Sequence, residues 1–172
     1  ELRDLTRTRK QLVREMSQHT LRIQKTLEDA NLKLDSVLSS VVGASGRAIL
    51  EALIRGETDP EHLADLAQGN ARKKRAALIE ALHGRITPHH RHLLRLHLDL
   101  IDALERALAD VDATVGKRLA PIQHCAERLT TVPGISEITA RVVIAEIGVD
   151  MSRFKTPAHL LSWATMCPRN DE

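Results

Sequence analysis

The sequence predicts an all-α protein, and two observations carry that prediction. Aromatic side chains are almost absent, because the 172 residues include one Phe, one Trp and no Tyr. Strands favour aromatic and β-branched side chains, so a stacked sheet built from this composition would be unusual. The apolar 42% of the chain is mainly Leu, Ala, Ile and Val, a mixture that suits helix interiors. The length allows one domain or two small ones.

The first element is a long helix that runs from Leu2 to about Val42, a stretch without Pro or Gly. Its apolar residues recur at spacings of four and seven and fall within about 60° of one another on a helical wheel. A helix of about 40 residues extends about 60 Å and needs a partner helix along its apolar stripe. The stripe consists of Leu5, Leu12, Met16, Ile23, Leu27 and Leu34.

A small helical insert follows at about residues 43–86. We expect a helix from Ser45 or Gly46 to Gly56, a second that starts at Asp59-Pro60 and ends at Gly69, and a third over residues 71–83. Thr87-Pro88 then begins a second long helix towards Leu119. Residues 1–119 therefore read as an antiparallel coiled-coil arm with a helical tip.

Residues 120–172 form a different unit. Pro121 interrupts or restarts the chain, and three further helices are expected: one to about Thr131, one over residues 136–147 and one from Pro157. The segment LTTVPGISEITA, residues 129–140, has the helix-hairpin-helix pattern of many DNA repair and recombination proteins.

Gly134 would let the hairpin turn approach a phosphate. The amides of Ile135, Ser136 and Glu137 would present the positive end of a helix to it. Such contacts bind the nucleic-acid backbone without reading bases. Ser136 stands where the pattern has a second Gly, and residues 129–172 carry four basic against five acidic side chains. The alternative is a plain helical hairpin packed inside its own protein.

A basic stripe is the second candidate for nucleic-acid contact. Arg3, Arg7, Lys10 and Arg14 are spaced four, three and four, opposite the apolar stripe, so one helix face could present four cations to phosphate. The alternative is an ordinary solvated face. The run at residues 72–75 (Arg-Lys-Lys-Arg) on the tip has the same two interpretations.

Other classes of function find little support. The net charge of +2 excludes a uniformly basic nucleic-acid coat. No stretch approaches the roughly 20 apolar residues of a membrane span, and no signal peptide is visible. The two cysteines lack metal-site spacing, and the histidines between residues 83 and 97 lack a known ligand pattern. We expect Asp99 and Asp102 to pair with Arg95 and Arg106 on their own helix. No catalytic or metal-binding residue is predicted.

Several ordered blocks carry a family resemblance. They are ELRDLTRTRKQLVRE and RIQKTLEDANLKL near the start, SVVGASGRAILEALIRGETDP, and LTTVPGISEITARVVIAEIGVDMSRFKTPAHLLSWATMCPRNDE at the end. Together they closely resemble bacterial insertion-sequence transposases of the DEDD/serine type, the family of bridge-RNA-guided recombinases. One departure is Thr165, where the family usually has Gly, which bears on close backbone packing after Trp163.

The resemblance implies a transposase whose chemistry lies outside this chain. The family's four acidic metal ligands would precede Glu1, and its nucleophilic serine would follow Glu172, so the chain itself is expected to lack strand-transfer activity. A divalent metal such as Mg²⁺ is implied for the parent enzyme and no cofactor for this piece. DNA is the implied partner, structured guide RNA is a further candidate, and the arm would join protomers into a homo-oligomer in the bacterial cytoplasm. The rival hypotheses are a structural coiled-coil interaction module without nucleic-acid binding and an inactive remnant.

Overall fold

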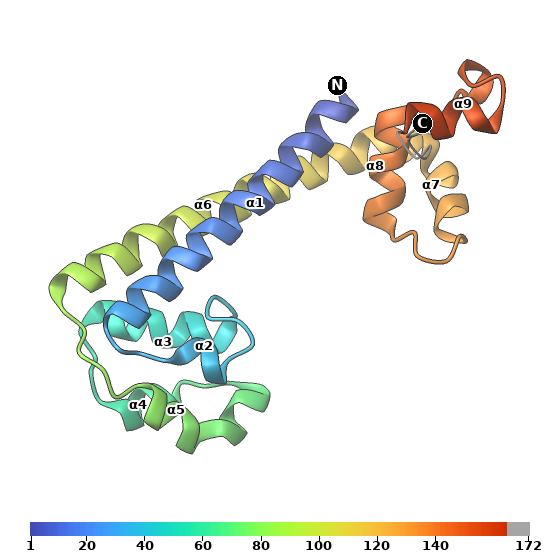
Figure 1. The fold of residues 1–172 in the computed structure, drawn as a ribbon. Helices are drawn as coiled ribbons and strands as arrows, with labels where there is room; N and C mark the ends of the chain where they lie inside the picture. The colour runs from blue at the N-terminus through green and yellow to red at the C-terminus, as the bar shows by residue number, and fades with distance from the viewer. Residues whose placement is uncertain (165–172) are drawn as a thin grey trace, which may run out of the picture. The chain divides into compact units, whose positions relative to one another are not determined.

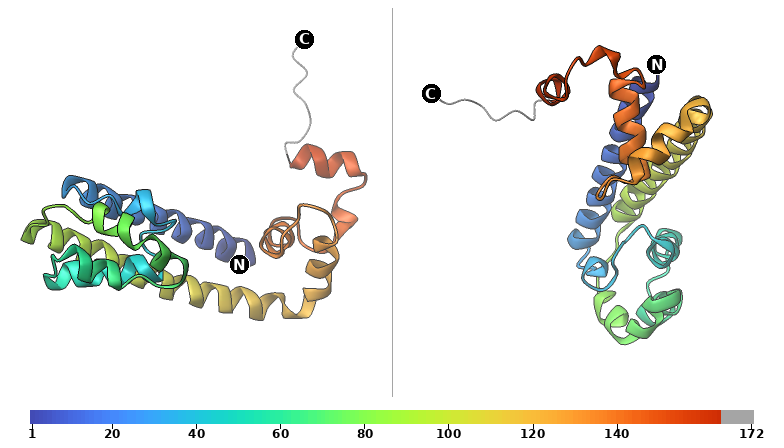
Figure 2. Two further views of the ribbon diagram at one scale, coloured as in Figure 1. Left: turned by 90° about the horizontal axis from the view of Figure 1, so that it is seen from below. Right: turned by 90° about the vertical axis from the view of Figure 1, so that its right-hand side faces the viewer.

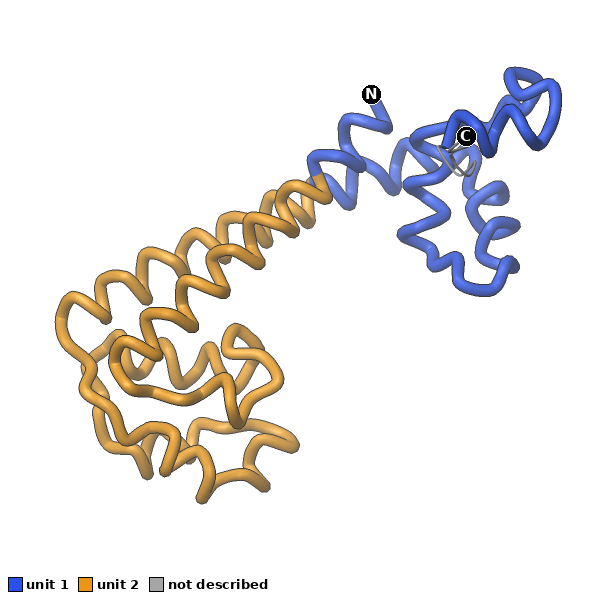
Figure 3. The backbone as a smooth tube through the Cα atoms, viewed as in Figure 1, with its two compact units in different colours: residues 1–8, 111–172 blue, residues 9–110 orange. Residues whose placement is uncertain are grey.

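The computed structural model describes residues 1–164, and all of the regular structure in these residues is helical (Figure 1). This confirms the all-α prediction. The chain divides into two compact units, residues 9–110 and residues 1–8 together with 111–172 (Figure 3). We call them the tip unit and the hairpin unit and describe each by itself. The predicted domain boundary between residues 119 and 120 stays a prediction. None of the described helices is long and apolar enough to cross a membrane.

The first long helix, α1 (Leu2–Asp29), ends more than ten residues before the expected position near Val42. Asn31 adopts a left-handed conformation with φ 57°. The N–H of Leu32 donates to the carbonyl of Leu27 (2.8 Å), and the N–H of Asn31 donates to that of Glu28 (2.8 Å). This is a Schellman end, and both Leu27 and Leu32 are buried, as its hydrophobic contact requires. The expectation of one helix to Val42 was therefore wrong, since Asn31 ends it without Gly or Pro.

The insert in the tip unit consists of short helices. They are α2 (Leu34–Val37), α3 (Ala44–Arg55), α4 (Pro60–Asp65), the 3-10 turn η1 (Gly69–Lys74) and α5 (Arg75–Ala81). The ends of α3 and the start of α4 are those that the sequence indicates, whereas the third helix, expected over residues 71–83, covers only Arg75–Ala81. Asp59 caps α4 by accepting from the N–H of Glu61 (3.2 Å), and Gly56 ends α3 at φ 106°. The second helix ends at Asp65 rather than Gly69, which instead begins η1.

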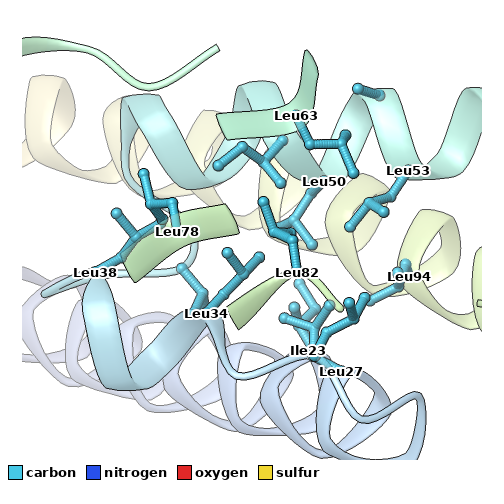
Figure 4. Packing of buried hydrophobic residues seen from close by; sticks show 14 of the residues in the cluster. Ile23, Leu27, Leu34, Leu38, Leu50, Leu53, Leu63, Leu78, Leu82 and Leu94 are labelled. Carbon is cyan, nitrogen blue, oxygen red and sulfur yellow. The ribbon is translucent and has the colours of Figure 1, made fainter. Parts of the chain in front are cut away.

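The core of the tip unit joins this insert to the long helices. Within this unit, α1 and α6 (Pro88–Leu119) run side by side in opposite directions (Figures 1 and 2). Leucines from α2, α3, α4 and α5 meet side chains of both long helices (Figure 4). The fully buried residues include Ile23, Leu27, Leu34, Leu50, Leu53, Leu63, Leu78, Leu94 and Ile101. The predicted arm over residues 1–119, like its coiled-coil character, stays a prediction.

The hairpin unit contains η2 (Ala120–Ile122), α7 (Gln123–Thr130), α8 (Glu137–Ile147), η3 (Met151–Arg153) and α9 (Pro157–Trp163). Its core combines the start of α1 with the end of α6 and the pair α7 and α8. Leu2 and Leu5 pack against a buried cluster of Val115, Leu119, Ala126, Ala140 and Ile144. This packing brings the first turns of the chain beside α8, which the sequence did not indicate.

Candidate nucleic-acid interface

The hairpin turn has the geometry that its Pro-Gly pair indicates. The N–H of Ile135 donates to the carbonyl of Val132 (3.1 Å), and Gly134 between them has φ 88°. Pro at the second position and a left-handed Gly at the third are the marks of a type II turn. Residues 131–134 are exposed, and apart from the two chain neighbours of Gly134 no atom lies within 4 Å of the position where its Cβ would stand. The turn is therefore open to an approaching ligand.

The start of α8 leaves backbone N–H groups free to donate, and they differ by one residue from those that the sequence suggested. Ser136 is the N-cap, and its Oγ accepts from the N–H of Thr139 (3.2 Å). The N–H of Ile135 is used by the turn. Within the described chain, no acceptor takes the N–H groups of Ser136, Glu137 and Ile138. Of the three amides that the sequence suggested, those of Ser136 and Glu137 are free to donate to an anion and that of Ile135 is not. The amide of Ile138 is a further free donor.

Electrostatics at the turn are close to neutral. The Glu137 carboxylate pairs with the Arg141 guanidinium one turn later (2.5 Å). The exposed neighbours are apolar, since Val132 is 48% and Ile138 is 52% exposed. The free N–H groups and the helix dipole would attract an anion only modestly. Such a site offers backbone donors to a phosphate, and contacts of this kind carry no sequence information.

The four cations of the basic stripe on α1 differ in their ion-pair partners. Arg3 and Arg7 both contact Glu146 in the last turn of α8. The Nε atoms of Arg3 and Arg7 lie 3.1 and 3.0 Å from its two carboxylate oxygens, and Arg3 Nη2 also donates to the Glu146 main-chain carbonyl (2.7 Å). Hydrogen bonding from Arg7, with the charges of Arg7 and Arg3, lowers the pKa of Glu146. The same carboxylate raises the pKa of Arg7.

Lys10 and Arg14 differ from this pair. Both are exposed, and neither forms an ion pair with a described residue. Sequence reasoning missed Glu146 altogether. Glu146 is the only charged residue between Arg141 and Asp150, and a single acid in so apolar a stretch is a signal for a specific partner.

The basic run on the tip has local structural roles. Arg72 Nε donates to the carbonyl of Ala67 (3.0 Å), and Lys74 Nζ donates to that of Val37 (2.7 Å). Arg75 pairs with Asp65 (2.6 Å). Three of the four cations in residues 72–75 therefore satisfy acceptors of their own unit, which favours the solvated-face interpretation of this run.

Neither histidines nor acids form a metal centre in the described residues, where no group of three or more metal-ligating side chains comes together. His19 and His97 form one interhelical contact, with their Nδ1 atoms 3.2 Å apart. Burial, and then the charges of His19 and Arg22, lower the pKa of His97.

The expected pairing of Asp102 with Arg95 or Arg106 was wrong. Arg47 of α3 pairs with Asp102 and lies 2.8 Å from Glu105 on the next turn of α6. A partner more than 50 residues away is invisible to a rule based on neighbours within one helix. The resulting pair connects the insert to α6 inside the tip unit.

Fold and site together define a class: an all-helical protein with a helical hairpin whose open turn exposes backbone donors. Residues 126–172, which include the later part of α7, the turn and α8, match the model of a family described as the Transposase IS116/IS110/IS902 family. A search of curated proteins gave no significant match, and neither did a search of solved structures.

The family match supports an insertion-sequence transposase, a role in moving such a sequence, and DNA as a partner. Thr165 and the CPRNDE block fall in the matched range but lie outside the described residues.

Proposed function

We propose that this chain takes part in the transposition of an insertion sequence by contacting the DNA backbone and by associating protomers of a transposase of the DEDD/serine type. The observation that carries the proposal is the family match over residues 126–172, which coincides with the hairpin and its open turn. The match points to DNA, and the free N–H groups of Ser136, Glu137 and Ile138 provide a way to contact a phosphate.

Two further elements support the contact. Lys10 and Arg14 are exposed cations on α1 without an ion pair among the described residues. Each could neutralise one phosphate without first breaking an internal bond. Structured guide RNA would offer the same backbone chemistry, so the proposal includes it as a competing ligand in the test below.

The described residues do not fit the Mg²⁺ ion that the resemblance implies for the parent enzyme, because no cluster of three metal-ligating side chains is present among them. We therefore assign no chemical step to this part of the protein. Its proposed contribution is positioning, through backbone contacts at the hairpin and through pairing of helices.

The second candidate is a structural interaction module that binds no nucleic acid. It is favoured by the internal ion pairs of Arg3 and Arg7, which leave the stripe with fewer available cations than its sequence suggests. The near-neutral turn supports it as well. Both candidates allow homo-oligomers, so oligomeric state does not separate them and nucleic-acid binding does.

The test uses fluorescence anisotropy with a labelled DNA duplex and a labelled RNA hairpin across a salt series. We expect log affinity for DNA to fall linearly with log salt, and Lys10→Gln with Arg14→Gln to reduce the slope by about 1.8. Lys73→Gln on the tip is the matched control and should leave the slope nearly unchanged. Failure to bind DNA at low salt would refute the proposal and leave the structural module. Preference for RNA would redirect the proposal to guide binding.

A second pair of variants tests the hairpin directly. Glu137→Pro removes one backbone donor at the first helical position, where proline is tolerated. Ser136 before it is already extended, with ψ 165°, as a residue preceding proline prefers. Glu137→Gln removes the same carboxylate but keeps the N–H group. If the turn binds phosphate, Glu137→Pro should bind DNA several-fold more weakly than Glu137→Gln. Equal affinities would show that the hairpin amides are not used.

A further inference from the structure

Arg3 and Arg7 converge on one acid in the hairpin unit. They lie four residues apart on α1, so their side chains project from successive turns towards the C-terminal end of α8. Three of their nitrogen atoms lie between 3.0 and 3.1 Å from the Glu146 carboxylate oxygens. A fourth contact, from Arg3 Nη2 to the Glu146 carbonyl, measures 2.7 Å. We call these two guanidinium groups the arginine fork.

The fork is more accessible than the acid that it holds. The side chains of Arg3 and Arg7 are 47% and 64% exposed, whereas that of Glu146 is 23% exposed. A carboxylate bound by paired N–H groups of guanidinium has the same donor pattern as a bound phosphate, because both anions accept two parallel hydrogen bonds. The fork thus already contains an anion of the geometry that a DNA backbone would supply.

We propose that Arg3 and Arg7 form a phosphate-binding site and that the Glu146 carboxylate occupies it as an internal competitor, which a backbone phosphate must displace. The inference rests on the proposed function, since it takes nucleic acid as the ligand. Displacement lowers the affinity for any phosphate, because the fork must first give up its contacts with Glu146. A single phosphate therefore binds the fork weakly, and a nucleic-acid backbone that also contacts other cations of the protein is favoured.

The test compares Glu146→Gln with the wild type in the DNA titration. Gln has the same shape but no charge, so it holds the two guanidinium groups more weakly, although the contact of Arg3 with the main-chain carbonyl remains. We expect tighter binding, because phosphate no longer has to displace a carboxylate, and a steeper salt dependence only in so far as Glu146 stays in the fork when the wild type binds DNA. Between about 50 and 200 mM salt, the variant should lose about 3-fold more affinity than the wild type if one arginine stays with Glu146 in the wild-type complex, and about 12-fold more if both stay. If DNA displaces Glu146 fully, the two slopes are equal and the gain in affinity alone reports the competition.

Controls separate this effect from a general change in charge. Glu127→Gln removes an exposed carboxylate of α7 that has no ion pair among the described residues, and it should alter the slope little. Adding Arg3→Gln and Arg7→Gln to Glu146→Gln should abolish the gain. Should Glu146→Gln fail to fold by circular dichroism, Glu146→Asp keeps the charge but shortens its reach, and it should give a smaller gain in the same direction.

The outcomes distinguish the competition by Glu146 from the proposed contact with DNA. A gain in Glu146→Gln that needs the arginines supports the internal competitor. Wild-type binding that Glu146→Gln leaves unchanged, or that Glu127→Gln strengthens equally, overturns the inference and leaves the proposed function standing. Absence of DNA binding by both wild type and Glu146→Gln overturns both. Binding by Glu146→Gln alone would refute the proposed function of the wild type, and with it the claim that phosphate displaces Glu146.

Discussion

Gly46 lies so close to the backbone of Val41 in the tip unit that a substitution there should change stability measurably. Gly46 is the third residue of α3 and is buried. A Cβ at this position would lie 2.1 Å from the Val41 carbonyl oxygen, 2.5 Å from its carbon and 2.9 Å from the Val41 Cα. All three are backbone atoms, so Gly46→Ala must displace either α3 or the segment before it.

The magnitude follows from two opposing effects. Overpacking a close-packed core costs about 1–3 kcal/mol, and this contact belongs at or above the top of that range because rigid backbone must move. Alanine returns up to about 1 kcal/mol through its higher helix propensity. We therefore expect Gly46→Ala to lower the free energy of unfolding by about 2 kcal/mol or more, which for a protein of this size lowers Tm by about 4–8 °C.

Thermal unfolding followed by far-ultraviolet circular dichroism measures the change, and Gly116→Ala is the matched control. Gly116 lies within α6, and apart from the neighbouring backbone of its own helix no atom lies within 4 Å of the position where its Cβ would stand. That substitution should stabilise the protein by about 0.5–1 kcal/mol. The reasoning fails if Gly46→Ala unfolds like the wild type, or if both variants lose the same stability.

Three further outcomes are expected. Since burial first lowers the pKa of His97 from 6.5, the unfolded chain takes up a proton there more readily than the folded one. The contribution of neutral His97 to the free energy of unfolding is therefore full above about pH 6.5 and is lost as the pH falls below it. Unfolding titrations across pH should show that His97→Gln makes this loss smaller and that exposed His92→Gln does not. Arg47→Met removes the ion pairs with Asp102 and Glu105, and should cost about 1–2 kcal/mol in chemical denaturation. Gly134→Ala should cost about 1–2 kcal/mol because of its φ of 88°, and Gly134→Asn less; equal losses would argue against backbone strain.

Local chemistry explains why much of the helical order was predictable. Asp59-Pro60 and Thr87-Pro88 combine a capping side chain with a proline at the first helical position, and both precede helices in the structure. The Thr87 hydroxyl accepts from the N–H of His90 (3.3 Å), and His90 Nδ1 accepts from the N–H of Thr87 in return (3.3 Å). Such signals lie within four residues, so the sequence alone carries them.

The end of α1 was not predictable in the same way. Asn31 is a weaker stop signal than Gly, and the apolar spacing continues through Leu34 as if the helix did. The Schellman end is favoured because Leu32 and Leu34 then become buried in the core of the tip unit. Tertiary burial therefore outweighed the local preference for more helix.

On a helical wheel the four cations of the basic stripe are equivalent. In the structure they differ, because two of them pair with an acid far away in the sequence. A wheel shows which residues share a face of α1, but it contains nothing about an acid that lies 139 residues further along the chain from Arg7. With Glu146 in the fork, only Lys10 and Arg14 would release counterions on binding DNA, which gives a stripe contribution to the salt slope of about 1.8. If phosphate displaces Glu146, all four cations contribute and the value approaches about 3.6. The wild-type contribution, taken as the slope lost when all four are replaced by Gln, therefore reports how far the internal acid yields to DNA. A value near zero would remove the stripe from the interface.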